Sequence, residues 1–153
     1  MEPFNGDRHL LIAVDSSENA QRAVRYVADF LGGVQRFRIT ILTVIPEPPS
    51  DYFETDEKRN RWIEERKSEV TNLLDKCRRI LVQSGFAEDK VETIADIRKC
   101  PSVADCILEM QQRLKCCTIV IGRRGVTKKE EFLFGSTSSK IVHSGKNCAV
   151  WVI

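Results

Sequence analysis

Apolar stretches alternate along the chain with segments in which the apolar residues recur every three or four positions. The first stretch, residues 9–15, is almost continuously apolar, as expected of a strand buried on both faces of a parallel sheet. The intervening segments have the spacing of amphipathic helices. This alternation predicts an α/β fold in which helices cover both faces of one parallel sheet. The expected strands are residues 9–15, 37–45, 90–97, 116–122 and 148–153.

Serines and glycines mark the ends of the expected helices. Ser16 and Ser17 provide N-cap residues for the first helix, and Ser102 with Asp105 resembles a capping box at the start of the third. Gly85 is placed to cap the end of the long second helix. The first helix is expected to end near residue 31 and the third near residue 114, while the second and fourth cover residues 57–84 and 136–144.

Size and composition limit the class of protein. A chain of 153 residues is expected to form one domain, residues 1–153, around a single core. With 24 basic and 22 acidic residues its net charge is +2, so it lacks the basic excess of a general nucleic-acid binder. It has neither an apolar run of roughly 20 residues nor a signal-like start, which favours a cytoplasmic protein without a membrane segment.

The six cysteines do not show the Cys-x2-Cys spacing of a zinc site. Without an export signal they are expected to be reduced, and three of them fall on periodic apolar positions, so packing is their expected role. These residues are Cys77, Cys100, Cys106, Cys116, Cys117 and Cys148.

The stretch that says most about function lies between the fourth expected strand and the fourth expected helix. It has the pattern Gly122-x2-Gly125-x9-Gly135-Ser136. Glycine exposes backbone amides, and the start of a helix adds free N–H groups. The stretch therefore predicts a concave, donor-rich surface suited to phosphate oxygens.

Two further residues are expected to lie beside these glycines. Asp15 ends the first expected strand, and Val44 lies at the end of the second. Because ligands bind beyond the carboxyl ends of parallel strands, an acid, an apolar wall and the glycine stretch are expected to meet in one nucleotide-binding cleft. A purely structural interpretation stays open, in which Asp15 caps the first helix and the glycines only form turns.

The glycine pattern, the sequence Val14-Asp15-Ser16-Ser17 after the first strand and the terminal strand together resemble the universal stress protein family, in its ATP-binding branch. The resemblance extends over essentially the whole chain. It implies a Rossmann-like, five-stranded parallel sheet in the order 3-2-1-4-5 and a dimeric protein. It also implies ATP, expected with Mg or Mn, held between strands one and four.

The resemblance assigns a role to each matching residue. Asp15 and Val44 would contact the adenine side of the nucleotide. The residues that would approach the ribose and the phosphates are Gly122, Gly125, Gly135, Ser136 and Thr137.

The loop inside the pattern is rich in basic residues. One or two of them are placed to neutralise a triphosphate, and Arg124 is the favoured candidate. The alternative is a solvated loop whose charge is balanced by Glu130 and Glu131. The basic residues are Arg123, Arg124, Lys128 and Lys129.

These features predict an ATP-binding regulator or sensor of the stress response that acts through nucleotide-dependent association. No catalytic residue is expected, because the pattern places no acid or histidine near a γ-phosphate. One alternative is a slow metal-dependent ATPase or nucleotidyl transferase with Asp15 or a loop carboxylate as a weak base. Another is a thiol redox or metal sensor that uses Cys116, Cys117 and possibly Cys100.

The last strand predicts self-association. Ala149, Val150, Trp151, Val152 and Ile153 form an apolar edge without a charged residue, which single domains normally protect. We expect a homodimer in which this segment, Cys148 to Ile153, pairs with its copy across a two-fold axis. The alternative is an edge covered by the protein's own helices.

Overall fold

The computed structural model describes residues 6–123 and 135–153. Within these residues, five parallel strands form one sheet in the order β3-β2-β1-β4-β5, which confirms the expected fold class and strand order. The strands are β1 (Arg8–Ala13), β2 (Phe37–Pro46), β3 (Val91–Arg98), β4 (Thr118–Ile121) and β5 (Ala149–Val152).

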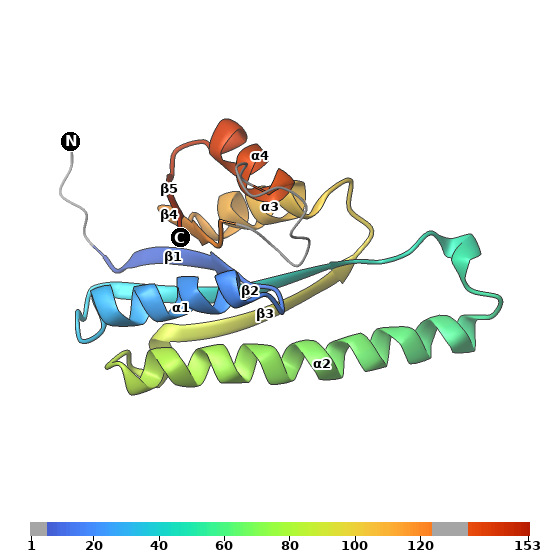
Figure 1. Ribbon diagram of the computed structural model, residues 1–153, viewed down its shortest axis with the longest axis horizontal. Coiled ribbons are helices and arrows are strands. Elements are labelled where there is room, and N and C mark those ends of the chain that lie inside the picture. Colours follow the sequence, from blue (N-terminus) through green and yellow to red (C-terminus); the bar gives the residue numbers. More distant parts are fainter. Residues whose placement is uncertain (1–5, 124–134) are drawn as a thin grey trace.

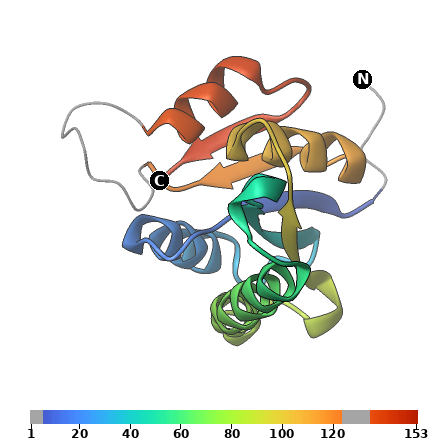
Figure 2. The same cartoon turned by 90° about the vertical axis from the view of Figure 1, so that its right-hand side faces the viewer.

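Helices cover both faces of the sheet, as Figures 1 and 2 show, with α1 and α2 on one side and α3 and α4 on the other. Two short 3-10 helices, η1 and η2, precede α2 and β3. The helical elements are α1 (Glu18–Leu31), η1 (Ser50–Tyr52), α2 (Asp56–Gln83), η2 (Glu88–Lys90), α3 (Val103–Leu114) and α4 (Ser136–Ser144).

The alternating side chains of the strands divide the core into two layers. On β1, Leu10 and Ile12 pack under α1 and α2, whereas Leu11 packs under α3 with Ile107. All four side chains are at most 2% exposed. Since each strand supplies both layers, a shift of one residue in register would exchange the two apolar sets and is strongly disfavoured.

The helix ends largely follow the expected signals. Ser17 caps α1, and its Oγ accepts a hydrogen bond from the backbone N of Ala20 at 3.2 Å. The end of α2 differs by one residue, because Ser84 is the C-cap and Gly85 follows it with φ +116°. A Cβ atom at Gly85 would lie 2.8 Å from the backbone N of Gly33, so glycine is required where the ends of α1 and α2 meet.

The long helix α2 extends past the end of the sheet (Figure 1), and its first buried residue is Val70. In the projecting half, Trp62 contacts Phe53 with ring centroids 5.8 Å apart, and the guanidinium of Arg66 lies 5.8 Å from the Trp62 ring. The apolar periodicity of residues 57–84 therefore overestimates how much of this helix packs on the sheet.

In the part of the chain that the structure describes, no helix is both long enough and apolar enough to span a membrane.

Candidate functional site

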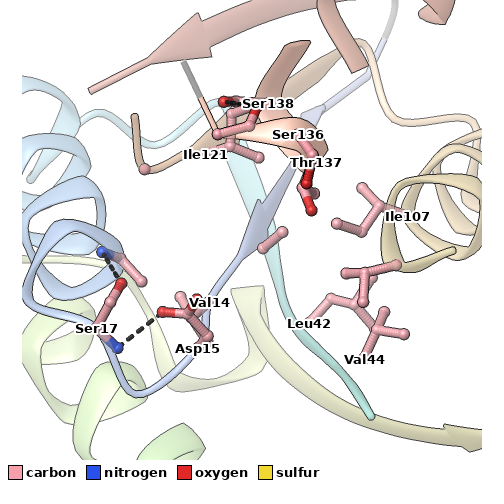
Figure 3. Close-up of a pocket in the computed structure, with 15 residues that line it drawn as sticks. Val14, Asp15, Ser17, Leu42, Val44, Ile107, Ile121, Ser136, Thr137 and Ser138 are labelled. Carbon is pink, nitrogen blue, oxygen red and sulfur yellow. Dashed lines mark hydrogen bonds between the residues drawn. The ribbon is translucent and has the colours of Figure 1, made fainter. Parts of the chain in front are cut away.

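A cavity of about 280 Å³ opens beyond the carboxyl ends of the central strands (Figure 3). The chain leaves β1 toward β2 on one side and returns to β4 on the other, so the strand order reverses at this point. Open parallel sheets bind ligands at such a reversal. The residues that line the cavity are Ala13, Val14, Asp15, Ser17, Ala20, Leu42, Val44, Val103, Ile107, Ile121, Gly122, Gly135, Ser136, Thr137 and Ser138.

One side of the cavity is apolar. Leu42 and Val44 extend into it from β2, and Val103 and Ile107 from α3. The two α3 residues are four positions apart, so they lie on the same face of the helix. Figure 3 shows Leu42, Val44 and Ile107 close together. This wall suits a flat ring better than a charged group.

Asp15 is the acidic residue of the lining. Its carboxylate is half-buried and accepts a hydrogen bond through Oδ1 from the backbone N of Ser17 at 2.8 Å, as Figure 3 shows. Ser17, and not Asp15, is the N-cap of α1. Asp15 therefore orders the turn before the helix and also faces the cavity, and a carboxylate retains acceptor capacity beyond this one bond.

The start of α4 forms a polar part of the lining. The first turn of a helix leaves its N–H groups without intrahelical partners, and the helix dipole makes this end positive. Gly135 is the N-cap and contributes no side chain that could accept from these groups. Ser136 and Thr137 follow it on the cavity wall. This geometry provides donors for an anion.

Ser138 joins the two ends of the glycine stretch. It is 3% exposed, and its Oγ lies 3.1 Å from the carbonyl O of Arg123 and 3.0 Å from that of Gly135. The backbone N of Gly135 also donates to the Arg123 carbonyl at 3.1 Å. The end of β4 and the start of α4 are thus held together.

The structure brings most of the residues expected from the sequence to this one cavity. Arg124 and Gly125 lie outside the described residues. The expected residues that line the cavity are Asp15, Val44, Gly122, Gly135, Ser136 and Thr137.

Sequence reasoning missed two parts of the lining. Val103 and Ile107 carry a signal, because they are apolar, four positions apart and at the start of a helix beside the carboxyl edge. Ser138 carries no such signal. It lies in a run of serine and threonine, and the sequence does not show which of these hydroxyl groups is buried until the position of the N-cap, Gly135, is known.

The cysteines form no disulfide in the described part of the chain. All six are free, and Cys77, Cys106 and Cys116 are buried. Burial raises the pKa of these three thiols, that of Cys116 to about 12, so little reactive thiolate forms at neutral pH. Among the described residues, no group of three or more His, Cys, Asp or Glu is arranged to hold a metal ion.

Solved structures with a similar fold exist. The protein MJ0577 superposes with a TM-score of 0.79 at 23% identity, with 95% of this chain and 94% of that one covered. A universal stress protein in complex with cAMP has a TM-score of 0.68 at 15% identity, with coverage of 97% and 98%. The Archaeoglobus fulgidus universal stress protein in complex with dAMP has a TM-score of 0.62 at 19% identity, with coverage of 96% and 97%. At these identities the likeness shows the fold alone.

No curated protein matches the sequence. The model of the universal stress protein family, in contrast, matches residues 7–153, which include all five strands and every described residue of the cavity. With this match over nearly the whole length, the chain belongs to the universal stress protein family.

Proposed function

We propose that the cavity binds an adenine nucleotide, with ATP as the principal ligand. The observation that carries this proposal is the pairing of an apolar wall with a helix start whose N-cap, Gly135, has no side-chain acceptor. The apolar wall would hold the base, and the helix start would hold the phosphates. The family membership and the complexes of structural neighbours with cAMP and dAMP support the same ligand class.

In this proposal the base lies against Val44 and the apolar wall, and Asp15 accepts from polar atoms of the base or ribose. Mg or Mn would be held chiefly by the phosphate oxygens, as is usual for a cation on a nucleotide. Arg124, in the loop, would neutralise part of the charge. The residues proposed to approach the ribose and the phosphates are Gly122, Gly125, Gly135, Ser136 and Thr137.

We further propose that the protein acts as a nucleotide-dependent regulator or sensor in the stress response, and not as a dedicated enzyme. Asp15 is the one carboxylate among the described lining residues, and Figure 3 shows it beside Val14 and Ser17, apart from Thr137. A general base must come within hydrogen-bond reach of the group that it deprotonates. A carboxylate apart from the start of α4 is poorly placed to activate water at phosphates bound there.

Calorimetric titration of the purified protein with ATP, AMP, adenosine and GTP, each with and without Mg or Mn, tests the ligand class. We expect ATP to bind more tightly than adenosine, because adenosine has no phosphates that could contact the start of α4. Absence of ATP binding at millimolar concentration would overturn the proposal. Release of phosphate in the same samples, if abolished in a Gly135→Asp variant, would show hydrolysis and contradict the binding-only role.

We also propose that two copies of the chain associate through β5. This strand pairs only with β4 in the described sheet, so its other edge is open. An apolar patch lies beside that edge: Phe30 is 63% and Tyr26 44% exposed, and the Phe30 ring contacts Trp151 at 6.1 Å between centroids. An open apolar edge supports strand pairing with a second copy.

Light scattering tests the association. We expect a dimer at micromolar concentration and a monomer after Trp151→Lys, which adds a charge to the edge strand. A Tyr52→Lys variant is the matched control, since Tyr52 is exposed on η1, away from β5. A monomeric parent protein would refute this proposal and leave the nucleotide proposal standing.

A further inference from the structure

We infer that Ser138 is a positioning residue of the proposed nucleotide site, because its buried hydroxyl ties the first turn of α4 to the end of β4 and so aims the amides of Ser136 and Thr137 into the cavity. This inference rests on the proposed function and extends it to a residue whose side chain makes its hydrogen bonds to the backbone.

The hydroxyl bridges two carbonyl groups that are distant in sequence. Its Oγ lies 3.1 Å from the carbonyl O of Arg123, fifteen residues earlier, and 3.0 Å from that of Gly135, one turn earlier. A hydroxyl has one proton to donate, so the two acceptors share it. The Arg123 carbonyl also receives the backbone N–H of Gly135 at 3.1 Å, which places two donors from α4 on one acceptor.

The acceptor itself is anchored to the sheet. The backbone N of Arg123 donates to the carbonyl O of Ile153 at 2.7 Å, and the backbone N of Ile153 donates to that of Ile121 at 2.9 Å. These bonds continue the pairing of β4 with β5 beyond the ends of the two strands, to Arg123 on one side and Ile153 on the other. Ser138 thus attaches the helix to a rigid part of the molecule.

Burial alone does not explain this arrangement. A buried serine hydroxyl in a helix is satisfied by a carbonyl of the preceding turn, and for Ser138 the Gly135 carbonyl would suffice. The additional contact with Arg123 is long-range, and it determines where the helix starts relative to the sheet. Because Ser136 and Thr137 lie between the two tied residues, the direction of their N–H groups depends on this contact.

The test compares ATP with adenosine in Ser138→Ala and Ser138→Cys. Loss of one hydrogen bond predicts about tenfold weaker ATP binding in Ser138→Ala, with adenosine affinity changed less than about twofold. Ser138→Cys fills the same position with a slightly larger group that is only a weak donor, so it should resemble Ser138→Ala if the bond matters and the parent protein if only filling the space matters. Ser139→Ala, one residue along the helix and outside the cavity lining, is the matched control.

Hydrogen exchange without nucleotide provides a second measurement. The Gly135 amide, which donates to Arg123, should exchange faster in Ser138→Ala and Ser138→Cys than in Ser139→Ala. Unchanged ATP affinity and unchanged exchange would overturn the inference, as would an equal loss of ATP and adenosine. If the parent protein binds no nucleotide, the proposed function fails, while the exchange at Gly135 still decides whether Ser138 holds the helix start.

Discussion

Three helices begin beside the cavity, and they begin in two different ways. Helices α1 and α3 are capped by Ser17 and Ser102, whose Oγ atoms accept backbone N–H groups at 3.2 and 3.1 Å. Helix α4 has Gly135 as its N-cap, and glycine has no side chain that could accept a hydrogen bond. A capping serine satisfies one of the free N–H groups of its helix, whereas the first turn of α4 receives no side-chain acceptor and is suited to one from a ligand. The contrast supports the proposal that the start of α4 receives the phosphates, while α1 and α3 contribute other parts of the lining.

The largest effect is expected when the start of α4 is converted to the capped type. Gly135→Asp supplies a favourable N-cap, and the backbone of Gly135, at φ −57° and ψ 155°, is open to any residue. The new carboxylate would accept the first-turn N–H groups and repel phosphates, so we expect ATP to bind about a hundredfold more weakly or worse. Calorimetry measures this loss, and thermal unfolding should show an unchanged or higher midpoint.

Gly135→Asn is the matched control, because it caps the helix without a charge. We expect ATP affinity between that of the parent protein and that of Gly135→Asp. If Gly135→Asp bound ATP within threefold of the parent protein, the start of α4 would not be the phosphate site.

The converse change removes the cap from α1. Ser17→Ala loses the bond to Ala20 and should lower the free energy of unfolding by about 1 kcal/mol. Chemical denaturation measures this change, and the ratio of ATP to adenosine affinity should stay constant, since α1 is not proposed to contact phosphates. A Ser16→Ala variant, at the exposed neighbouring serine, should leave the stability within experimental error. A selective loss of ATP affinity in Ser17→Ala would remove the distinction between the two kinds of helix start.

The smallest effect concerns the cap of α3, which also contacts α4. Nζ of Lys140 lies 2.8 Å from Oδ2 of Asp105, and Ser102 donates to the same oxygen at 2.6 Å. These two bonds lower the pKa of the Asp105 carboxyl below its usual value, and the bond from Lys140 has the larger effect. A lowered folded-state pKa contributes stability above the unfolded pKa, and that contribution is lost as the pH falls through the folded value.

Asp105→Asn should therefore be slightly less stable than the parent protein at pH 7, and the difference should disappear in acid, below the usual aspartate range. Urea denaturation at both pH values measures it. Because the pair is exposed, the effect at pH 7 should also shrink in high salt. A difference that persisted unchanged at low pH would show that the ionised carboxylate is not its source.

The sequence reveals much of this architecture, because strand and helix periodicities are local properties. The Ser102 cap, the range of α4 and the Asp15 and Val44 positions follow from short patterns and agree with the structure. The strand order was implied by the resemblance to the family, since no local pattern determines which strands are neighbours.

The features that were missed depend on distances between elements. The contribution of Val103 and Ile107 depends on where α3 crosses the sheet, and the inward direction of Ser138 depends on the position of Arg123. Trp62 has the right periodicity for the core but lies in the half of α2 that extends beyond the sheet. The helix pattern does not show where the sheet ends along the helix. Cys117, expected in the fourth strand, precedes β4, which begins at Thr118.

The most direct test of the central claim is the response of backbone amides to ATP in nitrogen–proton correlation spectra. We expect large shifts for the amides of Ser136 and Thr137, at the start of α4, and smaller shifts for those of Ala20 and Asp105, which already donate to the capping serines. Adenosine should leave the first pair nearly unmoved. Saturable ATP binding without a shift at Ser136 or Thr137 would contradict the claim that α4 receives the phosphates.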